Sequence, residues 1–314
     1  MRAVWLTAFG PPEVLVAGEA PDPEPGDGQV LVETAWAGVT FVDTMVRAGR
    51  SPQPGGGPEL PVILGNAVGG VVSAGAPDLV GRVVVASLNG RGGYAERAVA
   101  AAEDAFPVPD GLEPAHAVAL LADGRTAVGL TTLVPPEPGQ RVLVEAAAGG
   151  VGSLLVQLAA AAGAHVIAAA SSAAKLEQAR GLGAADTVNY AEPDWPVSVG
   201  GPVDLVYDGV GGEIGAAALE LVAPGGRFAT FGLASGTPTD TAPAAGRGVA
   251  LAGFEQLRAI AGRRHEFTRT ALAEAAAGRL KALVGHVHPL ERADAAHRAI
   301  EARQVYGKAL LFTQ

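Results

Sequence analysis

The stretch from Arg141 to Ala170 reads RVLVEAAAGGVGSLLVQLAAAAGAHVIAAA and indicates the fold of this part of the chain. Arg141 to Ala147 is a short apolar run typical of a buried strand, Gly150 to Ala162 is typical of a helix, and His165 to Ala170 is a second strand. The alternation continues, with a helix predicted at residues 175–181 and strands predicted at 186–190, 203–208 and 227–231. Strands that alternate with helices form right-handed βαβ crossovers. The sequence therefore predicts an α/β Rossmann domain with a doubly wound parallel sheet.

A glycine-rich turn joins the first strand of this region to the first helix. Residues 147–152, AAGGVG, follow the pattern G-x-G-x-x-G with Ala147 in the first place. Between a strand and a helix this pattern is typical of a dinucleotide site, because glycine lets the backbone approach a pyrophosphate and the helix N-terminus offers N–H groups to the anion. Ala147 requires a turn without positive φ at that residue. An ordinary strand–turn–helix of small residues is the alternative. The predicted contacts in the turn are Gly149, Gly150, Val151 and Gly152.

The end of the second strand indicates which dinucleotide binds. NAD sites usually place an acidic residue there for the ribose 2′-hydroxyl, whereas this strand ends in Ala-Ala-Ala followed by Ser171 and Ser172. Lys175 lies on the next predicted helix. Hydroxyl groups and a lysine suit a 2′-phosphate, so the sequence favours NADPH over NADH. Ser171 or Ser172 could also cap the helix, which is compatible with phosphate binding.

The N-terminal part of the chain has a different pattern. Residues 1–121 contain short Val-rich runs bounded by Gly and Pro, at 29–35, 69–74, 81–86 and 93–99, as expected of an antiparallel, barrel-like domain. Residues 51–61 (SPQPGGGPELP) are predicted to be a flexible loop, residues 114–134 a helix, and the tail from about His286 strand–helix–strand. We therefore expect two domains, 1–121 with 266–314 and 122–265.

Composition excludes several kinds of function. The net charge is −10 and no cluster of Lys and Arg stands out, so nucleic acid is not an expected partner. The chain has no cysteine, which removes disulfides, thiolate nucleophiles and cysteine-ligated zinc; no other metal site and no G-x-S-x-G serine is evident. The sequence predicts neither a signal peptide nor a membrane span. A cytoplasmic enzyme acting on a small molecule is the expectation.

Several segments resemble the quinone oxidoreductase branch of the zinc-free medium-chain dehydrogenase/reductase superfamily, the group that includes zeta-crystallin. They are VLVEAAAGGVG, the stretch from HVIAAASS to DTVNY, GVTFVDT at 38–44, GGYAE at 92–96, DGRTA at 123–127 and GKALL at 307–311. The resemblance implies a GroES-like β-barrel catalytic domain, a homodimer, and hydride transfer from NADPH to a quinone or another α,β-unsaturated carbonyl compound. It also implies further cofactor contacts, with Lys175 and Tyr190 at the 2′-phosphate, and with Gly209, Phe231, Gly232 and Lys308 elsewhere.

The predicted catalytic residues are Thr40, Asp43 and Thr126. An enolate oxygen formed after hydride transfer needs hydrogen-bond donors, for which Thr40, Thr126 and backbone N–H groups are candidates. Asp43 either orders a hydrogen bond near the nicotinamide or is a first-turn acid of a helix from Thr44 to Ala48. Thr40 and Ala67 stand where the family has asparagine and glutamate. This departure leaves two alternatives, a pathway-specific enoyl or enone reductase for a larger natural product, and a protein that binds NADPH without turnover.

Overall fold

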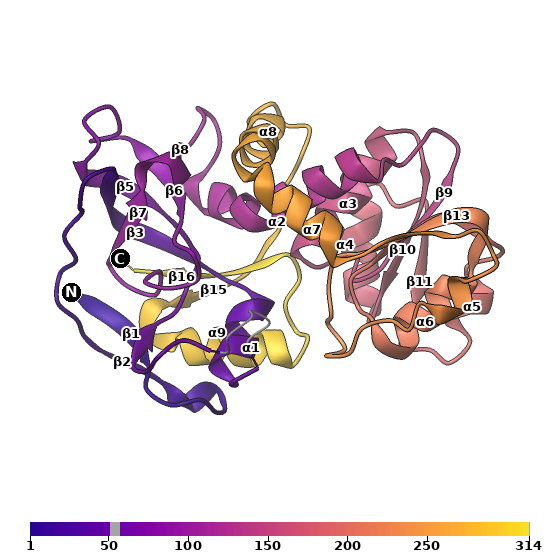
Figure 1. The fold of residues 1–314 in the computed structure, drawn as a ribbon, viewed down its shortest axis with the longest axis horizontal. Helices are drawn as coiled ribbons and strands as arrows, with labels where there is room; N and C mark the ends of the chain where they lie inside the picture. Colours follow the sequence, from indigo (N-terminus) through magenta and orange to yellow (C-terminus); the bar gives the residue numbers. More distant parts are fainter. Residues whose placement is uncertain (51–56, 314) are drawn as a thin grey trace. The chain divides into compact units, whose positions relative to one another are not determined.

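The computed structural model describes residues 1–50 and 57–313, which form two compact units. Unit 1 comprises Met1–Ala122 and Ala271–Gln314, and unit 2 comprises Asp123–Thr270. The sequence placed the divisions after residues 121 and 265. Figure 1 shows that each unit has its own sheet structure, with the first and last parts of the chain together in unit 1.

Unit 2 is built on a six-stranded sheet in which all neighbouring strands are parallel. The strand order is β11-β10-β9-β12-β13-β14. The strands are β9 (Arg141–Val144), β10 (His165–Ala170), β11 (Asp186–Asn189), β12 (Val203–Asp208), β13 (Val222–Thr230) and β14 (Ala250–Ala252). The helices that connect or follow them are α3 (Gly150–Ala161), α4 (Ala173–Gly181), α5 (Trp195–Ser198), α6 (Gly212–Glu220) and α7 (Phe254–Gly262). The predicted doubly wound Rossmann sheet is confirmed.

The direction of winding reverses between β9 and β12. The chain runs from β9 outward to β10 and β11, then returns to the other side of β9 for β12, β13 and β14. Ligands of doubly wound sheets bind outside the carboxyl ends of the strands at such a reversal. The glycine-rich turn follows β9 at this point.

Several predicted boundaries in unit 2 are wrong by a few residues. β9 ends at Val144 instead of Ala147, because the backbone turns at Ala146 with φ of 47°. β13 begins at Val222, five residues before the predicted Arg227, and α4 begins at Ala173 instead of Lys175. The strand β14 was not predicted, since three residues with little apolar periodicity give no clear signal.

Unit 1 contains a seven-stranded sheet and a small three-stranded sheet. The order in the large sheet is β15-β16-β3-β5-β6-β8, with β7 also paired to β3, and in the small sheet it is β2-β1-β4. All these pairs are antiparallel except β15 with β16. The predicted GroES-like domain is confirmed. The strands are β1 (Arg2–Leu6), β2 (Leu15–Glu19), β3 (Gln29–Val39), β4 (Val62–Ile63), β5 (Ala67–Gly75), β6 (Val83–Ser87), β7 (Arg97–Ala101), β8 (Ala105–Pro107), β15 (Val284–Pro289) and β16 (Lys308–Phe312).

The other α-helices lie in unit 1 or at the boundaries between the units. They are α1 (Phe41–Arg47), α2 (Pro114–Leu133), α8 (Arg264–Ala276) and α9 (Ala293–Glu301), of which α2 and α8 each contain a boundary between the units. The predicted helix at Thr44 to Ala48 begins three residues earlier than expected, because Thr40 acts as its N-cap. Residues 51–56 of the predicted loop lie outside the described residues, and residues 57–61 belong to no helix or strand.

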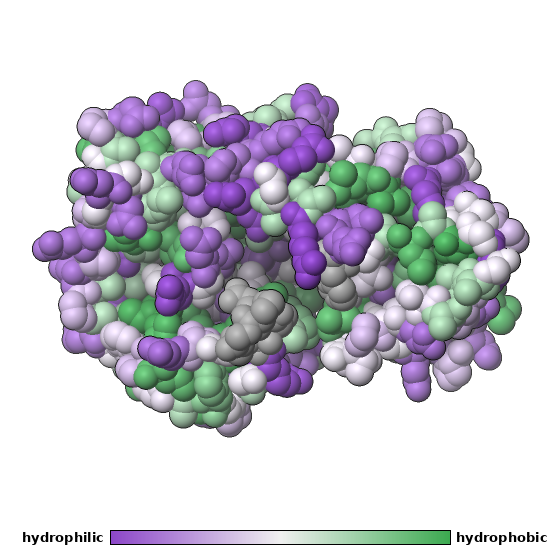
Figure 2. Space-filling view, viewed as in Figure 1, coloured by the Kyte–Doolittle hydropathy of each residue, from purple (hydrophilic) through white to green (hydrophobic). Residues whose placement is uncertain are grey.

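One side of the molecule has a mixed surface. Figure 2 shows hydrophilic residues over both units on the side in view, interspersed with hydrophobic ones. Within residues 1–50 and 57–313, no helix combines the length and apolar character that a membrane crossing requires.

Candidate functional site

The glycine-rich turn is closed by its own backbone. The N–H of Gly149 donates to the carbonyl oxygen of Ala146 at 2.7 Å, and Gly149 then becomes the N-cap of α3 with ordinary extended dihedrals, φ −77° and ψ 175°. Ala147 avoids positive φ as expected, and it is Ala146 that adopts it. Gly149 caps α3 without a side chain, so the helix N-terminus is presented by backbone alone.

Gly152 is required by packing. A Cβ atom at Gly152 would lie 2.2 Å from the carbonyl oxygen of Ala146, so the predicted close approach of helix and strand end is confirmed. At Gly150 a Cβ would lie 2.0 Å from Oδ2 of Asp123, a residue of α2. A side chain at either position would change the turn, although only the contact at Gly152 is with rigid backbone.

The predicted 2′-phosphate residues come from two neighbouring strand ends. Ser171, Ser172 and Lys175 follow β10 and are half-buried. The N–H of Tyr190 donates to the carbonyl oxygen of Ala170 at 3.1 Å, which brings Tyr190 beside the end of β10. Ser172 is the N-cap of α4, but its side chain makes no capping hydrogen bond, so capping does not account for its hydroxyl.

The charge around these strand ends suits a phosphate. The first acid after β10 is Glu177, which is exposed on α4 and pairs with Arg180 at 3.1 Å. No carboxylate follows directly on β10, where a 2′-hydroxyl would require one. The residues present therefore fit NADPH, with the helix N-terminus for the diphosphate and Ser171, Ser172 and Lys175 for the 2′-phosphate.

Three further predicted cofactor residues come together at the ends of β12 and β13. The N–H groups of Phe231 and Gly232 donate to the carbonyl oxygen of Asp208 at 2.8 and 3.3 Å. A Cβ at Gly209 would lie 2.5 Å from Cζ of Phe231, and a Cβ at Gly232 would lie 2.6 Å from the carbonyl oxygen of Gly209. The two glycines thus allow the two strand ends to meet.

In unit 1, Thr40 and Asp43 form the capping box of α1. The N–H of Asp43 donates to Oγ1 of Thr40 at 3.1 Å, while the N–H and the hydroxyl of Thr40 donate to Oδ2 of Asp43 at 2.7 and 2.8 Å. The interpretation of Asp43 as a first-turn acid is confirmed, and its role near the nicotinamide stays a prediction. The hydroxyl proton of Thr40 is committed to Asp43. Thr126 is half-buried in the part of α2 that belongs to unit 2.

Asp43 is part of a buried polar group that the sequence did not predict. The hydroxyl of Tyr94 lies 3.0 Å from Nε2 of His297, and both side chains are 0% exposed. Burial raises the pKa of Asp43, against which hydrogen bonds from Thr40 and the positive charge of Lys308 act. Burial, followed by the charge of Asp43, raises the pKa of Tyr94 well above its usual value. Lys308, predicted as a cofactor contact, is thus a buried residue whose charge acts on Asp43.

The sequence gives one clue to this group. Thr40 and Asp43 have the spacing S/T-x-x-D/E of a capping box, which predicts a helix beginning at residue 41. Nothing local connects Tyr94 with His297, since 203 positions separate them.

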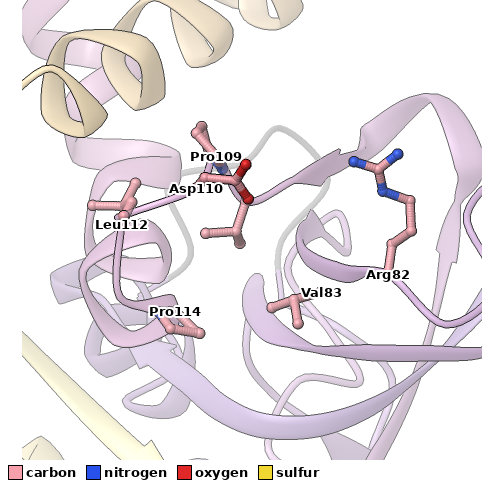
Figure 3. A pocket seen from close by; sticks show the side chains of 8 residues that line it. Arg82, Val83, Pro109, Asp110, Leu112 and Pro114 are labelled. Carbon is pink, nitrogen blue, oxygen red and sulfur yellow. The ribbon is translucent and has the colours of Figure 1, made fainter.

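A separate pocket in unit 1 has a volume of about 370 Å³. Figure 3 shows Arg82 on one side of it and Leu112 and Pro114 on the other. None of its lining residues is a predicted cofactor or catalytic residue, so it gives no support to the candidate site. They are Arg82, Val83, Val108, Pro109, Asp110, Gly111, Leu112 and Pro114.

Comparisons with known families match both halves of the chain. Residues 26–110 match the family described as alcohol dehydrogenase GroES-like domain, and residues 150–277 match the family described as zinc-binding dehydrogenase. A 2-haloacrylate reductase of a Burkholderia species is 32% identical over 332 residues, covering 100% of this chain and 99% of that protein. Quinone oxidoreductase 1 of Escherichia coli is 31% identical over 327 residues, covering 96% of each chain.

Solved structures agree with these relatives. A mycobacterial protein complexed with NADPH is 34% identical, with a TM-score of 0.88 and full coverage of both chains. The Escherichia coli quinone oxidoreductase complexed with NADPH also has a TM-score of 0.88, with 27% identity and full coverage. The likeness therefore extends over both units and both ends of the chain.

Proposed function

Because this chain belongs to the quinone oxidoreductase branch of the zinc-free medium-chain dehydrogenase/reductase superfamily, we propose that it is an NADPH-dependent reductase that transfers hydride to a quinone or another α,β-unsaturated carbonyl compound without a metal ion. The observation that carries the proposal is the strand end after β10. It offers Ser171, Ser172 and Lys175 and no carboxylate, beside a helix N-terminus presented by glycine backbone. This arrangement favours the phosphorylated dinucleotide.

The chain's own residues have three tasks in this reaction. The turn from Gly149 to Gly152 binds the diphosphate, and Ser171, Ser172, Lys175 and Tyr190 hold the 2′-phosphate. When bound, NADPH supplies the hydride. The protein must then stabilise the negative charge that develops on the substrate oxygen, for which preorganised donors are effective.

The candidate hydrogen-bond donors for the substrate oxygen differ in whether they already donate to another group. Thr126 and backbone N–H groups remain candidates for the substrate oxygen. Thr40 serves only if its hydroxyl turns away from Oδ2 of Asp43, to which it donates at 2.8 Å. Solvent would deliver the final proton, to the α-carbon of an enone or to the oxygen of a quinone. A metal ion has no part in the scheme, since the chain lacks cysteine and has Ala67 where its relatives' motif has glutamate.

The substrates for which the relatives are named support this substrate class. An acrylate and a quinone both contain a carbon–carbon double bond conjugated to a carbonyl group. This conjugated group is the part of each compound that can accept a hydride. Thr40 and Ala67 mark the positions where this chain departs from the family motif. They favour, as a second candidate, a reductase for one particular enoyl or enone intermediate of a larger natural product. We also propose that the protein is a cytoplasmic homodimer.

An acceptor screen tests the proposal. Purified protein is mixed with NADPH and a panel of quinones, enones and acrylates, and the loss of reduced-nicotinamide absorbance is followed. One parallel reaction contains NADH in place of NADPH, and another contains NADPH with a metal chelator. We expect acceptor-dependent oxidation that prefers NADPH and is unchanged by the chelator. Tight NADPH binding without oxidation by any acceptor would instead support a non-catalytic NADPH-binding protein.

A further inference from the structure

Two buried carboxyl groups meet at the point where the winding of the unit 2 sheet reverses. Glu145 directly follows β9, and Asp208 is the last residue of the neighbouring strand β12. Both side chains are 0% exposed. No local pattern joins them, because β10, β11 and three helices lie between them in the sequence. Neither has a role in the reaction proposed above.

The two carboxyl groups share a hydrogen-bond donor. The N–H of Val210 lies 3.0 Å from Oδ1 of Asp208 and 3.3 Å from Oε2 of Glu145. Asp208 has three further donors: the N–H of Gly211 at 2.8 Å, the hydroxyl of Thr230 at 3.2 Å and the hydroxyl of Thr239 at 2.7 Å. Oε1 of Glu145 is buried and has no hydrogen-bond partner within the described residues.

The unequal number of hydrogen-bond donors indicates which of the two carboxyl groups is protonated. Asp208 accepts four hydrogen bonds, which stabilise a carboxylate, whereas Glu145 accepts one. Burial, and then the negative charge of Asp208, raise the pKa of Glu145 well above its usual value. Two adjacent buried carboxyl groups cannot both ionise without a compensating cation. The geometry and the raised pKa together make Glu145 the group of the two that holds a proton.

Other charged groups on the surrounding elements do not supply that cation. Arg141 and Asp204 lie at the amino ends of β9 and β12, where the N–H of Arg141 donates to Asp204. Arg227 of β13 donates to Gln140 and to the carbonyl oxygen of Pro135. Glu213 of α6 is exposed, and Asp123 of α2 lies against Gly150. Within the described part of the chain, Asp208 is the charged group that acts on Glu145.

The same pair supports the predicted cofactor residues. The side chain of Asp208 holds the N–H groups of the turn that begins α6, and its carbonyl oxygen accepts from Phe231 and Gly232. A Cβ at Gly215 of α6 would lie 3.2 Å from both carboxylate oxygens, so the helix also packs on Asp208. The position of Gly209 follows from these contacts.

We propose that Glu145, as a neutral acid, and Asp208 act together as a positioning pair, which holds the turn from Gly209 to Gly212 in the form that binds NADPH. The pair fixes the carboxyl ends of β9 and β12 on either side of the ligand-binding reversal. Loss of the neutral Glu145 side chain separates these ends and weakens NADPH binding. This inference rests on the proposed assignment of Gly209, Phe231 and Gly232 to the cofactor.

Direct binding measurements on three variants test the pair. Glu145→Gln keeps a neutral side chain with a donor and an acceptor, Glu145→Leu removes both, and Glu220→Gln alters an exposed glutamate of α6 as the matched control. NADPH dissociation constants are measured by fluorescence, with the Tm of each variant alongside. We expect Glu145→Leu to weaken NADPH binding by about tenfold, the order of effect of a lost buried hydrogen bond. Glu145→Gln and the control should stay within about threefold of wild type.

The proton on Glu145 has its own readout, which does not depend on turnover or on NADPH. The infrared spectrum should contain the C=O band of a protonated carboxylic acid at neutral pH, which Glu145→Gln removes and Glu220→Gln retains. A raised folded pKa means that the contribution of Glu145 to stability is present below its ordinary value of 4.5 and is lost as the pH rises. Glu145→Gln should therefore exceed wild type in Tm at neutral pH.

The outcomes are distinguishable. NADPH binding to Glu145→Leu at wild-type strength, or a spectrum without the acid band, overturns the positioning pair. Wild-type protein that binds NADPH but oxidises it with no acceptor contradicts the proposed function and leaves the pair intact. If Glu145→Leu does not fold, the infrared band and the binding and Tm of Glu145→Gln still decide the matter, because an ionised Glu145 would make that variant bind differently from wild type.

Discussion

Two glycines of the same turn should fail for different reasons when they are changed to alanine. In Gly152→Ala the new Cβ would lie 2.2 Å from the carbonyl oxygen of Ala146, so α3 or the turn must shift. Overpacking of this kind costs about 1–3 kcal/mol. For a unit of the size of Asp123–Thr270, that cost corresponds to a decrease in Tm of roughly 2–12 °C.

Gly149→Ala should fold almost normally. Gly149 has φ of −77°, which any residue adopts, and its Cβ would lie 3.1 Å from the same carbonyl oxygen, so a shift of a few tenths of an ångström is sufficient. The methyl group would nevertheless stand where the predicted diphosphate approaches the backbone. Loss of one charge-assisted hydrogen bond, at about 1.5–3 kcal/mol, should weaken NADPH binding by roughly 10-fold to 150-fold.

Calorimetry and fluorescence titration together separate the two effects. We expect Gly149→Ala to change Tm by less than about 2 °C while losing NADPH affinity, and Gly152→Ala to lose both. Gly181→Ala, on α4 with open space at the Cβ position, is the control and should alter neither. Wild-type NADPH affinity in Gly149→Ala would refute the assignment of this turn to the diphosphate.

Three further predictions concern the cofactor, unit 1 and the catalytic candidates. Lys175→Ala should raise the Kd of NADPH about tenfold, with the Kd of NADH unchanged, because the charge-assisted contact is to the 2′-phosphate alone; equal losses for both dinucleotides would contradict this. Burial and then Arg47 lower the pKa of His297 to about 3 from 6.5, so stability is lost as the pH falls below 6.5. Urea unfolding should show wild type losing about 2 kcal/mol more than His297→Gln between pH 7 and pH 5, and equal losses would refute a neutral buried imidazole. Thr40→Val should cost about 1 kcal/mol of stability through the lost N-cap, and Thr40→Ser should restore it; the difference in kcat between the two variants then reports any role of the hydroxyl in the reaction.

Local patterns were sufficient for the main features of unit 2. The alternation of strand and helix predicted the parallel sheet, and the order of Gly149, Gly150 and Gly152 after β9 predicted the turn and the start of α3. These features depend on residues that are neighbours in sequence, so periodicity and turn chemistry report them. The identity of the residue with positive φ was not predictable in this way, because Ala146 adopts it under the constraint of the hydrogen bond from Gly149.

The features that were missed depend on contacts between distant segments. Tyr94 and His297 meet because β16 pairs with β3 and α9 packs on α1, and a single sequence contains no signal for that partnership. Glu145 and Asp208 are more accessible to prediction, since each is an acid at the end of an apolar strand. Two such strands pair as neighbours only in the folded sheet, so their shared donor was not foreseen. The capping box of Thr40 and Asp43 was available in the sequence and fixes the start of α1.

Isotope transfer tests the central claim most directly. Protein is incubated with an enone acceptor and NADPH that carries deuterium on one face of nicotinamide C4, and then with the other labelled form, in ordinary water. Direct hydride transfer predicts deuterium at the β-carbon of the saturated product from one of the two labelled forms, with a solvent proton at the α-carbon. A saturated product without deuterium from either form, or NADPH oxidation without any reduced acceptor, would contradict the account.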